Sequence, residues 1–170
     1  MKTYCGNPGR SAHRMSLAAA EKIYECRSLL SDMFNLNAPE RVVFTLNTTS
    51  ALNIIIKGIL QNGDHVITGN TEHNSVLRPL YELKRTRRIS VSKIDSLEDD
   101  GEIISQIEAL ANPRTKAVIL SHSSNVIPRV MPIKKIGQFC RSRSIFFILD
   151  CAQSAGVYDV NMENDCVDAL

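Results

Sequence analysis

The sequence predicts an α/β fold in which a mostly parallel sheet carries helices on both faces. Segments with the apolar character of strands alternate along the chain with segments of helical periodicity. Two of the strand-like segments, Ala117–Leu120 and Ile145–Leu149, are apolar without interruption. Uninterrupted apolar strands are typical of parallel sheets, because helices cover both of their faces.

The predicted strands are rich in apolar and β-branched residues, and turn residues such as Gly63 and Asp64 stand beside them. In chain order they are Arg41–Leu46, Asp64–Gly69, Arg88–Ile94, Lys116–Ser121 and Ile145–Asp150. No low-complexity linker or internal repeat separates them, so residues 1–170 are expected to belong to a single domain.

The predicted helices precede or separate these strands. In chain order they are Ser16–Leu36, Ser50–Leu60, Asn74–Thr86, Gly101–Ala111 and Pro132–Arg143. Asp99 or Asp100 is placed to cap the fourth helix, and Pro132 suits the first turn of the fifth. Pro79 can lie in the first turns of the third helix or kink it.

The composition is ordinary for a soluble globular protein, with 44% hydrophobic and 22% charged residues. A net charge of +2 gives no indication of a nucleic acid or an acidic membrane surface as a partner. The densest basic stretch, residues 84–88, is predicted to be a solvated helix end. The polar start after Met1 and the shortness of the apolar runs favour a cytoplasmic protein without a signal peptide or membrane segment.

Several common functional motifs are missing from the sequence. It has no G-x-G-x-x-G dinucleotide fingerprint, no P-loop and no G-x-S-x-G nucleophile elbow. Its five cysteines include no C-x-x-C pair and its four histidines lack the spacing of metal ligands, so no metal site is predicted. Cys151 is interpreted as a small buried residue.

Polar side chains gather after the predicted strands, where ligands bind in open α/β sheets. They occupy residues 47–50, 70–74, 122–125 and 150–153. Thr48, Thr49 and Ser50 allow two interpretations, because hydroxyls at a helix start either cap the helix or help to bind a phosphate. His73 taken alone is more often a surface residue, and Asn125 taken alone is most often a turn residue.

Asp150 closes an apolar strand and is harder to explain by structure alone. A buried carboxylate is costly unless it meets a cation or hydrogen-bond donors. No basic residue is near Asp150 in the sequence. We therefore expect its partner to be distant in the chain or to be a bound molecule.

A series of motifs gives these strand ends a context. N-T-T-S-A-L-N, T-E-H-N-S, H-S-S-N-V, P-I-K-K-I-G and D-C-A-Q-S-A-G follow one another along the chain. In this order they resemble the cysteine desulfurases of the class V aminotransferase family, which are fold type I enzymes that use pyridoxal 5'-phosphate (PLP). The resemblance extends over almost the whole chain. It implies that residues 1–170 are the N-terminal part of the PLP-binding large domain.

The resemblance also implies how the cofactor is held. Thr49, with Thr48 and Ser50 at the start of the same helix, would bind the phosphate. Asp150 would face the pyridine nitrogen and keep it protonated, because a nearby negative charge favours the cationic form. A protonated ring is the better electron sink.

Three further residues receive roles from the same resemblance. His73 is the predicted catalytic residue, which would stack on the ring and move a proton during desulfuration. Asn125 and Gln153 would contact the region of the ring oxygen and fix the tilt of the ring.

The chain departs from the family pattern at several positions. Ser50 stands where many relatives have Glu, and Cys151 replaces a common Gly or Ala. Ile127 and Pro128 replace the usual small pair. The Schiff-base lysine and the persulfide cysteine of the family lie further along than Leu170, as does the small C-terminal domain. The sequence is therefore expected to be an inactive fragment truncated before that lysine.

The implied function is PLP-dependent cysteine desulfuration, in which L-cysteine or a related amino acid loses sulfur to an acceptor. A sulfur-acceptor protein and a second copy of the chain, in a homodimer, are the implied partners. Two alternatives stay open. One is a related class V enzyme, such as a selenocysteine lyase or an aminotransferase. The other is a non-catalytic binding or assembly domain that keeps the fold.

Overall fold

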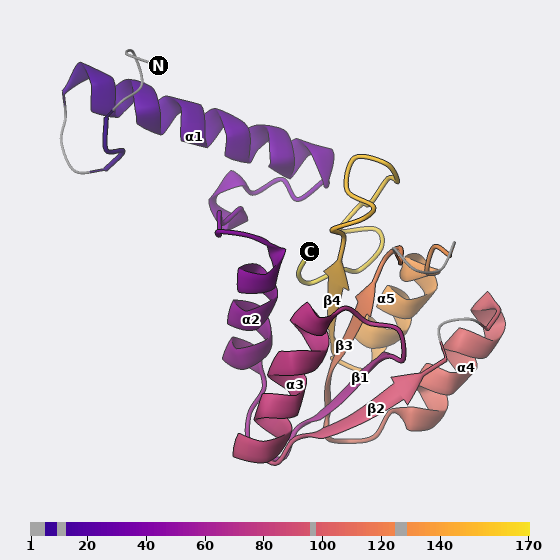
Figure 1. Cartoon of the computed structure of the whole chain (residues 1–170). Helices are drawn as coiled ribbons and strands as arrows, with labels where there is room; N and C mark the ends of the chain where they lie inside the picture. The colour runs from indigo at the N-terminus through magenta and orange to yellow at the C-terminus, as the bar shows by residue number, and fades with distance from the viewer. Residues whose placement is uncertain (1–5, 10–12, 96–97, 125–128) are drawn as a thin grey trace. The chain divides into compact units, whose positions relative to one another are not determined.

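The computed structural model of the chain describes residues 6–9, 13–95, 98–124 and 129–170 (Figure 1). The chain divides into two compact units, Met1–Phe44 and Thr45–Leu170. The first unit contains helix α1 (Arg14–Met33) and a short 3-10 helix, η1 (Pro39–Arg41). The second unit contains the sheet and the remaining helices, and it therefore positions the strand ends.

Helix α1 confirms the first predicted helix with different bounds. His13 caps it, because its Nδ1 accepts a hydrogen bond from the N–H of Ser16 at 3.2 Å. The helix stops before Asn35, whose φ of 51° lies in the left-handed region that ends helices.

The predicted strand Arg41–Leu46 is wrong. Arg41 belongs to η1, and no strand forms over residues 42–46. A strand needs a neighbour for its backbone N–H and C=O groups, and no described strand pairs with this segment. Val43 and Leu46 are 73% and 94% exposed. The apolar pattern that predicted a strand here is therefore not used for burial.

Four strands form one sheet in the order β2-β1-β3-β4. Their bounds are His65–Gly69 for β1, Ser90–Ile94 for β2, Thr115–Ser121 for β3 and Phe146–Asp150 for β4. Each neighbouring pair is parallel, for example Ser121 of β3 beside Asp150 of β4. The parallel sheet that the apolar runs predict is confirmed.

Helices cover both faces of this sheet (Figure 1). They are α2 (Thr48–Ile59), α3 (Asn74–Thr86), α4 (Asp100–Leu110) and α5 (Ile133–Ser142). Helix α2 begins earlier than the predicted Ser50, because Asn47 is its cap. Asp99 caps α4 by accepting from the N–H of Glu102 at 2.9 Å. Pro79 lies inside α3 and is buried there.

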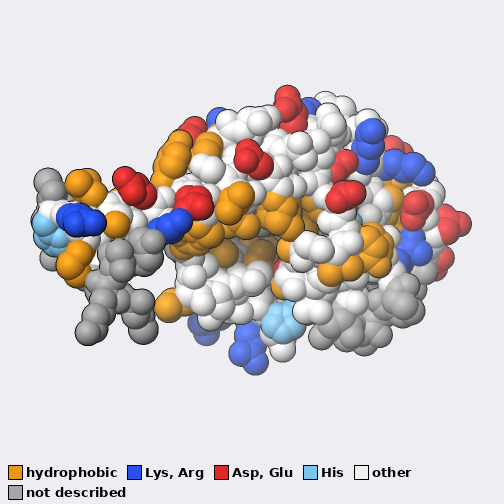
Figure 2. Space-filling model, turned by 90° about the horizontal axis from the view of Figure 1, so that it is seen from above, with side chains coloured by type: hydrophobic (Ala, Val, Ile, Leu, Met, Phe, Trp, Pro, Cys, Tyr) orange, Lys and Arg blue, Asp and Glu red, His pale blue; other side chains and the backbone are white. Residues whose placement is uncertain are grey.

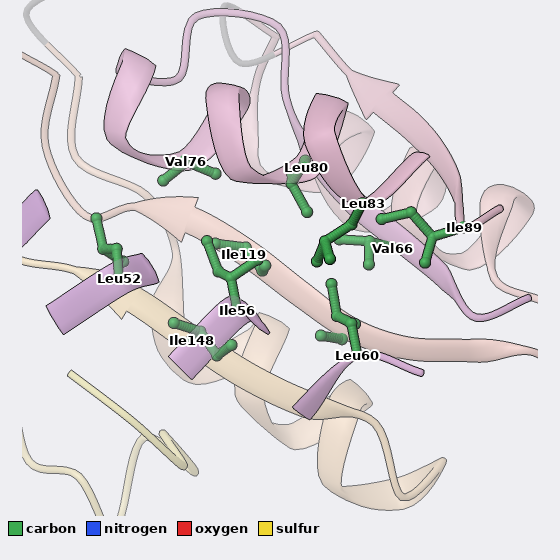
Figure 3. Packing of buried hydrophobic residues seen from close by; sticks show 11 residues of the cluster. Leu52, Ile56, Leu60, Val66, Val76, Leu80, Leu83, Ile89, Ile119 and Ile148 are labelled. Atoms are coloured by element: carbon green, nitrogen blue, oxygen red, sulfur yellow. The ribbon is translucent and has the colours of Figure 1, made fainter. Parts of the chain in front are cut away.

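The core under α2 and α3 explains why these helices lie on the sheet (Figure 3). It joins buried side chains of the two helices to alternate residues of the strands, namely Leu52, Ile56, Val76, Leu80, Leu83, Val66, Ala117, Ile119 and Ile148. The residues between them on the strands, such as Ile67 and Val118, are buried as well. Both faces of the strands are therefore covered, as their continuous apolar sequence requires.

The order of the strands creates a switch point. From β1 the chain crosses to β2 on one side, and it then crosses back to place β3 on the other side of β1. In open α/β sheets, ligands bind beyond the carboxyl ends of strands where the direction of winding reverses. A ligand-binding site is therefore expected at the ends of β1 and β3.

The basic run of residues 84–88 is only partly a solvated helix end. Lys84 and Arg85 lie in the last turn of α3 and are exposed. Arg87 instead donates from its guanidinium to the carbonyls of Lys57 at 2.7 Å and Leu60 at 2.5 Å. Its charge therefore stabilises the carboxyl end of α2.

None of the described helices is at once long enough and apolar enough to cross a bilayer.

Candidate functional site

A cavity of about 250 Å³ lies at the carboxyl ends of β1, β3 and β4 and at the start of α2. Figure 2 looks onto this end of the second unit, where the surface is hollowed and uncharged side chains predominate. The lining is mostly polar: Asn47, Thr48, Thr49, Thr71, His73, Ser75, Ser121, Ser123, Ser124, Asp150, Ala152 and Gln153. Its size is close to the roughly 300 Å³ at which pockets for small molecules begin.

The start of α2 presents hydrogen-bond donors to this cavity. Asn47 caps the helix, with its Oδ1 accepting from the N–H of Ser50 at 2.9 Å and from the hydroxyl of Ser50 at 3.1 Å. The N–H groups of Thr48 and Thr49 meet no acceptor among the described residues. These free N–H groups and the positive end of the helix dipole favour an anion.

A chain of hydrogen bonds joins α2 to the start of α3. The hydroxyl of Thr49 lies 2.7 Å from the hydroxyl of Ser75, which lies 2.8 Å from Nδ1 of His73. His73 also caps α3, because its Nδ1 accepts from the N–H of Ser75 at 3.1 Å. These contacts place a hydroxyl and an imidazole on the same wall of the cavity.

Asp150 ends β4 with its carboxylate at the cavity. The residue is 7% exposed, and its Oδ1 accepts from the N–H of Ala152 at 3.0 Å. Within the part of the chain that the structure describes, no Lys, Arg or His forms an ion pair with it. A buried carboxylate without a cation is costly, so Asp150 is suited to bind a positively charged donor.

A second buried carboxylate, Glu72, lies on the loop after β1. Ser121 donates its N–H to both carboxylate oxygens, at 3.1 and 3.0 Å, and its hydroxyl to one of them at 2.6 Å. Burial raises the pKa of the Glu72 carboxyl, the hydrogen bonds from Ser121 oppose the rise, and the charge of Asp150 adds to it. A second negative charge is therefore disfavoured at Glu72, beside Asp150.

The loop after β4 is held by a buried histidine. Nδ1 of His122 lies 3.0 Å from the hydroxyl of Ser154, and the N–H of His122 donates to the carbonyl of Asp150 at 2.9 Å. Burial lowers the pKa of His122 and raises the pKa of Cys151 to about 11. Cys151 is thus a buried thiol, in agreement with its interpretation from the sequence.

The predicted site residues are brought together in large part. Thr48, Thr49, His73, Asp150 and Gln153 all line the cavity. Two further predictions have other outcomes. Ser50 is absent from the lining and contacts the Asn47 cap, and Asn125 lies outside the described residues.

Sequence reasoning gave no role to Glu72, Ser75 or Ser121. Glu72 and Ser75 stand in the T-E-H-N-S motif, and Ser121 ends a predicted strand, so their positions carried a signal. Their contacts join residues far apart in the chain, which no local pattern indicates.

The family model for class-V aminotransferases matches residues 1–170 of the chain. The chain belongs to this family. Cysteine desulfurase IscS of Tolumonas auensis is 34% identical to this class-V chain over 169 residues. Cysteine desulfurase IscS of Vibrio vulnificus is 35% identical over 170 residues. The chain spans 41% of the length of these curated relatives, and the alignments cover 97% of the chain.

Solved structures agree with the class-V assignment. The apo cysteine desulfurase of Thermococcus onnurineus NA1 superposes with a TM-score of 0.86 at 30% identity, over 97% of this chain and 42% of that chain. SspA in complex with cysteine superposes with a TM-score of 0.83 at 25% identity, over 97% of this chain and 48% of that chain. The predicted architecture, a part of the fold type I large domain, is therefore confirmed.

Proposed function

We propose that this chain supplies the cofactor-binding part of a PLP-dependent cysteine desulfurase, which removes sulfur from L-cysteine and leaves L-alanine. The observation that carries the proposal is Asp150, a buried carboxylate that lines a cavity and pairs with no described cation. A protonated pyridine nitrogen carries a positive charge and an N–H group. It can therefore pair with this carboxylate and donate a hydrogen bond to it. The names of the relatives, which are cysteine desulfurases, support cysteine as the substrate.

The donors around the cavity suit both ends of PLP. A phosphate dianion matches the free N–H groups of Thr48 and Thr49, the hydroxyls of the same residues and the positive end of the α2 dipole. The ring nitrogen matches Asp150. The cofactor contacts of Ser50 and Asn125 stay predictions.

Each residue then has a task in the reaction. PLP supplies, when bound, a protonated ring that withdraws electrons from the substrate carbon. Asp150 would accept a hydrogen bond from the ring N–H and would keep the proton in place. Gln153 would help to hold the ring, and His73 would lie against it and move a proton to or from the substrate.

The same proposal includes the organisation of the whole protein. Residues 1–170 are the N-terminal part of a PLP-binding large domain, and a homodimer in the cytoplasm carries out the reaction with a sulfur-acceptor protein. The alignments cover 41% of the relatives' length, which supports the assignment of the chain to one part of such a protein.

Titration of PLP into the purified chain tests the proposal. We expect saturable binding, followed by the absorbance of the ring, and a rise in the melting temperature with PLP concentration. Asp150→Ala and Thr49→Ala are expected to weaken binding at least tenfold. Ser105→Ala is the matched control, because among the described residues its hydroxyl bonds only to the carbonyl of Gly101 on α4. Equal affinity in all four proteins would overturn the proposal.

A further inference from the structure

Ser75 lies between the side chains of Thr49 and His73. Its hydroxyl lies 2.7 Å from the Thr49 hydroxyl and 2.8 Å from Nδ1 of His73. All three residues line the cavity, and Ser75 itself is buried. One hydroxyl therefore connects the start of α2 to the start of α3.

The contacts of Ser75 determine which nitrogen of His73 carries the proton. A backbone N–H can only donate, and the N–H of Ser75 points to Nδ1 of His73 at 3.1 Å. Nδ1 must therefore accept, so the neutral imidazole carries its proton on Nε2. Nε2 has no hydrogen-bond partner among the described residues. It is the nitrogen that a molecule in the cavity can reach.

The hydroxyl protons of Thr49 and Ser75 are coupled. When the Ser75 hydroxyl donates to Nδ1 of His73, its oxygen is free to accept from the Thr49 hydroxyl. When an anion binds at the start of α2, the Thr49 hydroxyl donates its hydrogen bond to the anion and no longer to Ser75. The Thr49 oxygen then becomes an acceptor for Ser75, and Nδ1 of His73 keeps only the backbone donor.

We propose that Ser75 is a positioning residue that couples the occupancy of the anion pocket at α2 to the hydrogen bonding of His73. The inference deepens the proposed function, since it rests on Thr49 as a phosphate contact and His73 as the proton-moving residue. It also assigns the reactive nitrogen, because a molecule in the cavity meets the Nε2–H of His73.

A capping role alone does not account for the Ser75 hydroxyl. The cap of α3 needs only the bond from the Ser75 N–H to His73, which any residue except proline supplies at this position. The hydroxyl adds a contact to Thr49 on a different helix, 26 positions away in the chain. Removal of the hydroxyl therefore separates coupling from capping.

Nitrogen NMR of the labelled chain, at a pH where the imidazole is neutral, tests the inference. Inorganic sulfate is the probe, because it carries the charge of a phosphate without its titration. In the unmodified chain we expect His73 to be protonated on Nε2, and its Nδ1 signal to shift as sulfate binds. In Ser75→Ala we expect the Nε2–H form to persist through the backbone donor while the sulfate-induced shift of Nδ1 is lost.

A double-mutant cycle makes the test specific. Thr49→Val removes the other end of the chain of hydroxyls, so Ser75→Ala added to it is expected to have no further effect on the sulfate-induced shift of Nδ1. Ser105→Ala, on the exposed face of α4, is the control and should respond to sulfate as the unmodified chain does. A full Nδ1 shift in Ser75→Ala would overturn the inference. So would a proton on Nδ1 in the unmodified chain.

PLP binding distinguishes this failure from failure of the proposed function. We expect Ser75→Ala to bind PLP severalfold more weakly than the unmodified chain, since the Thr49 hydroxyl is no longer held. If the unmodified chain binds no PLP but the sulfate response of His73 depends on Ser75, the proposed function fails and the coupling stands. If PLP binds and the response does not depend on Ser75, the coupling fails alone.

Discussion

The carboxylate of Glu72 ties the loop after β1 to the last residue of β3 through Ser121, next to the carboxylate of Asp150. The bond lies at the switch point of the sheet, where β1 and β3 are neighbours. Glu72 thus stabilises the wall of the cavity as a structure, but its charge adds to the charge of Asp150. These two effects on stability have opposite signs, and they can be measured separately.

Glu72→Gln is predicted to change how stability depends on pH. Burial holds the folded-state pKa of Glu72 above its ordinary value of 4.5, so the folded chain keeps a proton that the unfolded chain releases. The free energy of unfolding therefore falls as pH rises from 4.5 through the raised pKa. Urea unfolding across this range should show a smaller fall in Glu72→Gln.

Comparison of Glu72→Ala with Glu72→Gln separates the effect of the hydrogen bonds from the effect of the charge, because alanine removes both and glutamine removes only the charge. Glu72→Ala leaves the partly buried N–H of Ser121 without its acceptor, which costs about 1–3 kcal/mol. If Glu72→Gln and the unmodified chain have parallel pH profiles, the carboxyl group of Glu72 titrates normally and the prediction is wrong.

His65 is predicted to make the chain sensitive to mild acid. Its ring is buried between Thr115 and Ser92, at 2.8 Å from Nδ1 and 2.9 Å from Nε2, and burial lowers its pKa below 6.5. The unfolded chain therefore binds a proton first, and stability is lost as pH falls from 6.5 through the lowered pKa. His65→Gln should lose less stability over this range.

The comparison needs a control for His122, whose pKa is lowered in the same direction. His122 is unchanged in His65→Gln, so the difference between the two pH profiles belongs to His65. An unchanged slope in His65→Gln would contradict the prediction.

The fold could be predicted from the sequence where a local pattern determines the structure. The uninterrupted apolar run Ile145–Leu149 has only one stable environment, between two layers of helices, and β4 lies there. The segment Arg41–Leu46 has a similar composition, but a strand also needs a partner with free backbone groups. Composition carries no information about that partner, so the prediction of a strand was wrong.

The site could be predicted as far as topology decides it. His73 follows β1 and Asp150 ends β4, and a parallel sheet brings residues at such positions to one edge. The contacts between side chains were not predictable. Whether the Ser75 hydroxyl meets Thr49 depends on how α2 and α3 pack, which is set by core residues such as Leu52 and Val76.

Arg87→Ala is predicted to loosen the carboxyl end of α2. The guanidinium donates to the carbonyls of Lys57 and Leu60. A hydrogen bond from a charged group contributes about 1.5–3 kcal/mol to the free energy of unfolding. We expect a loss of about 1–3 kcal/mol in urea unfolding because Arg87 is only half-buried. Amide exchange should accelerate in the last turn of α2.

Two variants delimit this effect. Arg87→Lys keeps the charge but lacks the planar fork that reaches both carbonyls, so it should lie between the alanine variant and the unmodified chain. Arg85→Ala removes an exposed charge from the last turn of α3 and should stay within about 0.5 kcal/mol of the unmodified chain. Equal losses at Arg85 and Arg87 would show that net charge, and not the contact with α2, is responsible.

Gly137→Ala is predicted to separate α5 from the segment that follows β4. A Cβ at Gly137 would lie 1.9 Å from the carbonyl oxygen of Asp165, and this backbone cannot yield as a flexible side chain does. Overpacking of this kind costs about 1–3 kcal/mol or more. Gly58→Ala is the matched control, because its Cβ meets nothing within 4 Å and alanine stabilises a helix interior. The control should gain about 0.5–1 kcal/mol. Chemical unfolding of both variants measures the two free energies of unfolding. An increase in both would mean that α5 and the segment after β4 do not pack this closely.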